Sequence, residues 1–200
     1  FDVTVFYLRY NNRIGAVLKK DTLTYQTYRL RTNVGDARNK GMESFVELDL
    51  LNAFFRDTLP VGFSVFSNLA VIDARYITSL DPSIKMGNKV EYVPLYNFKS
   101  GFSFKYKKVK MSYQYSFVSE QYTEATNAVK PLPAATDGVI PAYRVMDVTL
   151  NYTYKRYTVE TGINNLLNTM YFTRRATAYP GPGIIPSDGR SFFLTLQVKV

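Results

Sequence analysis

The last eleven residues of the chain alternate between apolar and polar side chains, and this pattern constrains the fold more than any other feature. From position 190 onward the sequence reads RSFFLTLQVKV. Successive side chains of a β-strand point to opposite faces of a sheet, so one face of this segment is wholly apolar. That face carries Phe192, Leu194, Leu196, Val198 and Val200. It must meet either the core of a soluble protein or lipid.

The same alternation returns along the chain, which predicts eight strands. They lie at residues 3–14, 41–51, 61–71, 96–106, 111–122, 146–155, 157–167 and 190–200. Strands of globular proteins usually have about 5 to 6 residues, whereas a tilted transmembrane strand needs about 9 to 11. The segments have the longer length, and the faces opposite the apolar ones carry Ser, Thr, Asn, Gln and Gly. This combination favours a transmembrane β-barrel with a wet interior over a soluble all-β fold, which remains the alternative.

The predicted connections alternate between short and long. Residues 107–110 and 155–156 form short basic turns, whereas 79–90, 123–141 and 177–189 are long and rich in Pro, Gly, Asn and Asp. Transmembrane barrels have short turns on the periplasmic side and long loops outside. We therefore expect the last strand to end at the periplasmic side. Residues 52–60 are an exception, because they are longer than a minimal turn but fall on the short side.

Composition excludes several classes of protein. The chain has no Cys and no His, which removes disulfide scaffolds, the usual zinc sites and the commonest activated nucleophiles. No apolar run reaches the roughly 18 residues of a membrane helix. Three acidic residues share one strand face: Glu43, Glu47 and Asp49. We interpret them as part of the hydrated inner surface of a barrel. We expect no enzyme activity, no cofactor and no resident metal.

The excess of positive over negative charge in the chain makes nucleic-acid binding an alternative. The net charge is +9, and FKYKKVKMSYQY interleaves lysines with aromatic residues. Alternation places these aromatics on one face, however, and the lysines cluster where a turn is predicted. A stacking platform needs both on the same surface, so we expect no nucleic-acid partner.

Three stretches resemble a known family. RTNVGDARNKGMESFVELDL contains an Asn-x-Gly and then a Gly-x-Glu, INNLLNTMYF at 163–172 has an Asn-Leu pair followed by an aromatic, and YPGPGIIPSDGRSFFLTLQVKV ends the chain. All three resemble segments of TonB-dependent outer-membrane receptors. The last is most similar to receptors for ferric citrate or related iron chelates. Val200 departs from the family, whose members usually end in an aromatic residue.

The resemblance implies an all-β fold, an antiparallel transmembrane β-barrel of about 22 strands. Residues 1–200 would be the C-terminal portion of it, about the last eight strands. The family's signal peptide and N-terminal plug domain are absent from this sequence, which opens with FDVTVFYLRY and is interpreted as the middle of a longer protein.

The function implied by the resemblance is TonB-dependent import of an iron chelate, ferric citrate or another siderophore, across the outer membrane of a Gram-negative cell. The implied partners are the lipid bilayer, lipopolysaccharide and the TonB complex, the last contacted through the missing N-terminal part. Two alternatives stay open: uptake of another nutrient such as a glycan, peptide or cobalamin, and a structural subunit of a larger outer-membrane complex.

Arginines near the predicted outer loops are the candidate ligand-binding residues. Guanidinium groups bind carboxylates with two parallel hydrogen bonds, which suits an anionic chelate. The candidates in or beside the long loops are Arg144, Arg174, Arg175 and Arg190, and the second strand adds Arg29, Arg31 and Arg38 in its outer half. The alternative for each is a solvated charge or a contact to an anionic lipid headgroup.

Overall fold

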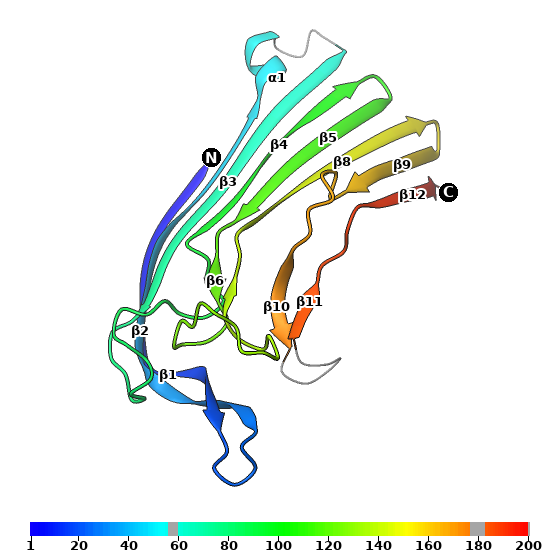
Figure 1. Ribbon diagram of the computed structural model, residues 1–200. Coiled ribbons are helices and arrows are strands. Elements are labelled where there is room, and N and C mark those ends of the chain that lie inside the picture. The colour runs from blue at the N-terminus through cyan, green and yellow to red at the C-terminus, as the bar shows by residue number, and fades with distance from the viewer. Residues whose placement is uncertain (56–59, 177–182, 200) are drawn as a thin grey trace.

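A computed structural model describes residues 1–55, 60–176 and 183–199, most of which lie in one curved antiparallel sheet (Figure 1). The neighbours in this sheet, in order, are β1 (Asp2–Lys20), β2 (Thr27–Asp49), β3 (Val61–Tyr76), β4 (Tyr96–Tyr106), β5 (Val109–Val118), β8 (Tyr143–Tyr154), β9 (Tyr157–Asn164) and β12 (Ser191–Val198). Each of the eight predicted segments therefore contributes a strand to this sheet. In the described part of the chain the sheet is open, with β1 and β12 at its two edges.

The remaining elements lie in the connections. Two small hairpins pair β6 (Gln121–Tyr122) with β7 (Val139–Ile140) and β10 (Phe172–Ala176) with β11 (Gly183–Pro186). A short helix, α1 (Leu50–Phe55), follows β2. No helix in the described residues is long and apolar enough to cross a membrane.

The two ends of the sheet differ as the sequence predicts. At the turn end, β4 joins β5 and β8 joins β9 through two-residue turns whose lysines Lys107 and Lys155 adopt left-handed backbone angles. At the loop end lie the long connections 77–95, 119–142 and 165–190. Both termini lie toward the turn end, on the side of α1 in Figure 1. The alternation of short and long connections is thus confirmed.

The register between neighbouring strands places most apolar side chains on one face of the sheet, here called the apolar face. Leu196 pairs with Val159, Leu150 with Met111 and Phe102 with Val65, so each strand continues the apolar surface of its neighbour. Asp147 pairs with Gln114 on the opposite, polar face. Many apolar-face side chains are exposed, among them Phe192, Leu194 and Leu196 at 67 to 73%. The predicted division into two faces is confirmed.

Three phenylalanines on the polar face break the alternation, and each lies opposite a glycine of the next strand. The pairs are Phe6 with Gly41, Phe66 with Gly101 and Phe193 with Gly162. A Cβ atom on Gly101 would lie 2.7 Å from the Phe66 ring and 2.1 Å from the Tyr113 carbonyl oxygen. The rings therefore cover bare backbone, which compensates for the poor packing of glycine in a strand.

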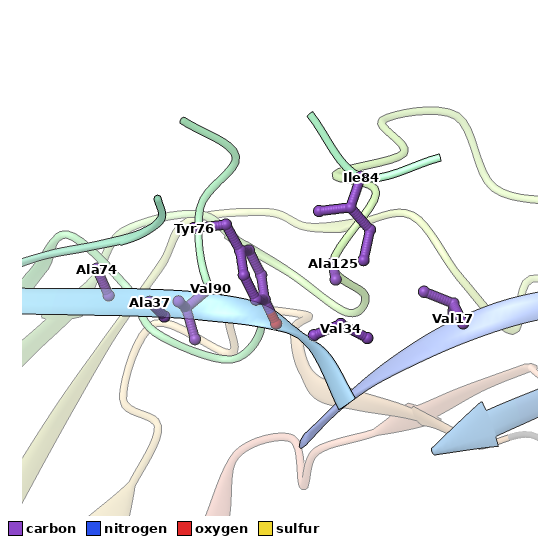
Figure 2. Packing of buried hydrophobic residues seen from close by; sticks show 8 residues of the cluster. All are labelled: Val17, Val34, Ala37, Ala74, Tyr76, Ile84, Val90 and Ala125. Carbon is purple, nitrogen blue, oxygen red and sulfur yellow. The ribbon is translucent and has the colours of Figure 1, made fainter. Parts of the chain in front are cut away.

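The main buried cluster of the described residues lies at the loop end, not in the middle of the sheet. Figure 2 shows β1, β2 and β3 packing there against the segments 77–95 and 119–142. The cluster consists of Val17, Val34, Ala37, Ala74, Tyr76, Ile84, Val90 and Ala125. Ala37 pairs with Tyr76 on the polar face, so the two long segments fold back over that face.

The structure corrects several predicted boundaries. The strand predicted at 41–51 gives way to α1 at Leu50, and the strand predicted at 111–122 ends at Val118. β1 and β2 continue well past the expected range, through a register shift between Tyr10 and Arg13, because alternation changes phase at a bulge. β9 ends at Asn164 rather than at residue 167. The predicted loop 177–189 contains β11, while its residues 177–182 and Val200 lie outside the described residues. The exceptional segment 52–60 begins inside α1, and its residues 56–59 are also not described.

Candidate ligand groove

Charged residues hold the segment 77–95 over the polar face. The Tyr76 hydroxyl donates to Glu91 Oε2 at 2.8 Å, and Arg13 Nη2 lies 3.6 Å from Glu91 Oε1. Burial, and then the Glu91 carboxylate, raises the pKa of Tyr76, so the phenol stays protonated and remains a donor. This segment is thereby fixed to β1 and β3.

A second ion pair ties the same segment to the end of β1. Lys19 Nζ lies 2.5 Å from Asp81 Oδ2. The lysine hydrogen bond, followed by bonds from Ser83, lowers the pKa of Asp81 to about 2. The Asp81 carboxylate is therefore ionised at every physiological pH. Its ion pair with Lys19 keeps the segment 77–95 attached to the end of β1.

A groove of about 630 Å³ opens on the polar face at the loop end, between β8, β9 and the β10–β11 hairpin. Its charged wall contains Asp147 of β8, Arg174 of β10 and Asp188 after β11. Tyr171 also lines it, and its ring stacks on Tyr143 with centroids 4.6 Å apart. The groove can therefore offer a guanidinium, carboxylates and an aromatic ring to one ligand.

Another groove, of about 730 Å³, lies at the turn end. Lys105 and Lys110 pair directly across β4 and β5 on its polar wall, and Asp49 also lines it. No predicted ligand residue lies there, so the loop-end groove is the better candidate for capture of a ligand from outside.

Two asparagines fix the turn beside the loop-end groove, and one of them, Asn165, lines it. Asn165 and Asn168 both have left-handed backbone angles, with φ of 51° and 53°. The buried Asn165 side chain donates to the carbonyls of Thr169 and Asp188 and accepts from the Thr169 amide. Asn168 Oδ1 accepts from the Arg190 amide at 2.9 Å. The INNLLNT stretch is thus a turn that joins β9 to the segment before β12.

We expect Asn165→Ala to destabilise this turn by about 2 kcal/mol, because three side-chain hydrogen bonds are lost and each contributes roughly 0.5–1.5 kcal/mol. Thermal unfolding of the complete protein in detergent measures the effect. The matched control is Asn164→Ala, since exposed Asn164 makes one long side-chain bond, 3.4 Å to Ser191. Equal losses in the two variants would contradict the structural role of Asn165.

The predicted ligand arginines fall in different environments. Arg174 is exposed and lines the loop-end groove. Arg175 is buried, and its guanidinium donates to the carbonyls of Ala135 and Val139 at 3.0 and 2.9 Å. Burial lowers the pKa of Arg175. Its hydrogen bonds join the β10–β11 hairpin to the 119–142 segment. Arg175 therefore holds these two parts of the loop end together.

The other candidates are not among the residues that line the groove. Arg144 is exposed and pairs with Phe117, which places it on the apolar face at the loop end. Arg190 is exposed beside β12. Arg38 also belongs to the apolar-face side, since it pairs with Arg9 and Arg75. The side chain of Arg29 is not described, and Arg31 is exposed on the extended part of β2.

The groove also contains residues that the sequence analysis did not select. Asp147 could have been found, because alternation already places it on the polar face of its strand. Asp188 and Tyr171 could not, since their approach depends on how the β10–β11 hairpin folds back. Among the described residues, no group of three or more His, Cys, Asp or Glu side chains is placed to hold a metal ion.

Comparison with solved structures identifies the fold. The ferric citrate transporter FecA, unliganded, superposes with a TM-score of 0.76 at 22% identity, over 98% of this chain and 28% of FecA. The copper transporter OprC gives 0.72 at 14% identity, over 98% and 28%. The ferric yersiniabactin uptake receptor FyuA from Yersinia pestis gives 0.70 at 17% identity, over 98% and 27%. This chain therefore spans less than a third of each.

Comparison of the sequence with family models assigns the chain to a family. A search of curated protein sequences found no match. The family model described as TonB dependent receptor-like, beta-barrel, matches residues 1–166, most of the chain. Members of this family are outer-membrane transporters rather than enzymes. The all-β antiparallel sheet with one apolar face and folded loops at one end agrees with that match, and the chain belongs to the TonB-dependent receptor β-barrel family.

Proposed function

We propose that this chain is the C-terminal barrel portion of an outer-membrane receptor that imports an iron chelate in a TonB-dependent manner. Similar structures include receptors named for ferric citrate, ferric catecholate and ferric yersiniabactin, which supports an iron chelate as cargo. The observation that carries the proposal is the exposed Arg174 in the loop-end groove. Among the described residues Arg174 has no ion pair, so its guanidinium is available to a carboxylate of the cargo.

The rest of the proposed mechanism lies in parts that this chain does not span. The outer loops would capture the chelate, and a plug domain, displaced through the TonB complex, would release it inward. Here the chain supplies the wall and the loops. Uptake of a glycan, peptide or cobalamin, and a structural role in a larger outer-membrane complex, are the alternatives.

Arg174→Gln in the complete receptor tests the proposal. We expect affinity for ferric citrate to fall about tenfold, because a charge-assisted hydrogen bond contributes about 1.5–3 kcal/mol. Calorimetric titration at about 10 mM salt, where the Debye length is roughly 30 Å, gives the largest effect. Binding of a neutral glycan should be nearly unchanged.

Arg144→Gln is the control, since it removes the same charge from the apolar face of the loop end. Arg175 is unsuitable for this test, because its replacement would release the β10–β11 hairpin. If Arg174→Gln and Arg144→Gln bind ferric citrate as tightly as the native receptor, Arg174 is not part of the cargo site.

A further inference from the structure

The loop-end groove has a local charge opposite in sign to that of the chain. The net charge of the chain is +9. Among the described residues, however, the charged side chains that line the groove are two aspartates and one arginine: Asp147, Asp188 and Arg174. A cleft lined mainly by one sign of charge attracts ligand groups of the other sign. The groove therefore favours a cationic ligand group, in addition to an anionic group that reaches Arg174.

One buried residue fixes the positions of both aspartates. The backbone amide of Asn165 donates to Asp147 Oδ1 at 2.8 Å, and its side-chain Nδ2 donates to the backbone carbonyl of Asp188 at 3.3 Å. Asn165 is 3% exposed, so water competes little for these bonds. The carboxylate of Asp147 and the backbone of Asp188 are thus in place before a ligand arrives, which lowers the ordering cost of binding.

The fold accounts for one of these carboxylates but not for the other. The Asp147 carboxylate accepts the Asn165 amide bond and so has a part in the turn. The exposed Asp188 carboxylate makes no hydrogen bond or ion pair in the described part of the chain. Arg174 forms no ion pair with either aspartate there. Both Asp188 and Arg174 therefore keep charges that are available to a ligand.

The aromatic ring of the groove favours the same kind of ligand. Tyr171 lines the groove, and Tyr143 stacks on its ring. The faces of a tyrosine ring attract cations. An ammonium group is therefore attracted by Asp188 and by the ring. A purely anionic chelate is attracted by Arg174 alone and is repelled by two carboxylates.

We propose that the cargo of the loop-end groove is a zwitterionic iron chelate, with a carboxylate that binds Arg174 and an ammonium group that binds Asp188. Asp147 adds to the negative potential around the ammonium. Guanidinium groups bind carboxylates with paired hydrogen bonds, and an ammonium offers three donors to a carboxylate. The inference rests on the proposed import of an iron chelate and narrows its cargo, because ferric citrate has carboxylates but no cationic group.

The test uses the complete receptor and two ferric chelates that differ in one charge. The first is ferric nitrilotriacetate with an aminobutyl arm that ends in an ammonium, and the second is the same chelate with that amine acetylated. Both present the same carboxylates to Arg174. Calorimetric titration at about 10 mM salt should show the ammonium form binding about tenfold more tightly, as for one charge-assisted hydrogen bond.

Asp188→Asn is the variant of choice, because the Asp188 carboxylate makes no described bond that holds the fold. We expect it to bind the ammonium form about tenfold more weakly and the acetylated form as the native receptor does. It should bind ferric citrate more tightly, since one repulsive carboxylate is removed. Opposite changes for two chelates exclude a general loss of structure. Asp147→Asn, which keeps the acceptor for the Asn165 amide, should also reduce the preference for the ammonium form.

Glu120→Gln is the matched control, because Glu120 is an exposed carboxylate of the 119–142 segment outside the groove lining. It should keep the native preference for the ammonium form. The same preference in Asp188→Asn, Asp147→Asn and the native receptor would overturn the proposed site. Equal binding of the ammonium and acetylated forms by a native receptor that binds ferric citrate would overturn the zwitterionic cargo and leave iron-chelate import standing. A receptor that binds none of the three ferric chelates would contradict the proposed function and this inference together.

Discussion

The substitution Leu196→Arg is expected to destabilise the complete receptor in a lipid bilayer by about 2–4 kcal/mol. This is the cost of placing an arginine side chain on the lipid face of a barrel at the bilayer midplane. Leu196 lies in the middle of the apolar residues of β12, pairs with Val159 and is 73% exposed. Its exposure shows that nothing in the described chain would shield the charge. Denaturant titration of the receptor in vesicles measures the loss.

The matched controls are the neighbours of Leu196 on the polar face. Gln197 pairs with Thr158, and Thr195 pairs with Glu160, which could accept a new guanidinium. Gln197→Arg and Thr195→Arg should therefore leave the free energy of unfolding within about 0.5 kcal/mol of the native value. If all three variants lose the same stability, the two faces of the sheet have been assigned the wrong way round.

Most of the strands could be predicted because they repeat a period of two over a long segment. In β4 and β5, for example, apolar and mostly aromatic side chains alternate with polar ones except at Ser100 and Val118, and the register pairs Phe104 with Met111 and Phe102 with Tyr113. The tight lysine turn between these strands fixes that register. Where periodicity and turn chemistry agree, as in β4 and β5, the sequence is sufficient to predict both the strands and their register.

The loop end could not be predicted in the same way. The register shift after Tyr10 changes the phase of β1, so alternation counted from its start fails beyond it. Arg174 and Arg175 are neighbours in a segment with Pro and Gly close by, and only the pairing of β10 with β11 shows that one is exposed and the other buried.

Arg38 shows that charge and strand phase must be considered together. Its position is even, like that of Met42, so alternation alone would have placed it on the apolar-face side. Charge alone groups Arg38 with the candidate cargo arginines, whereas its phase places it on the opposite face from the groove.

Residues 1–200 expressed alone are expected to aggregate in buffer without detergent. The apolar face has no cover among the described residues, with Phe192 72% and Leu194 67% exposed. The edges formed by β1 and β12 also leave unpaired backbone groups that can pair with other molecules. The buried cluster at the loop end is too small to offset this exposure, because it covers only the ends of three strands.

Refolding from urea with and without detergent, followed by sedimentation velocity, checks this expectation. Detergent above its critical micelle concentration should keep the chain dispersed by covering the apolar face, although the two edges remain unpaired. The comparison therefore separates the two causes: dispersion in detergent points to the apolar face, and aggregation that persists in detergent points to the edges. A monodisperse monomer with a cooperative melt in buffer alone would mean that the apolar face meets a protein core, which is the soluble all-β alternative.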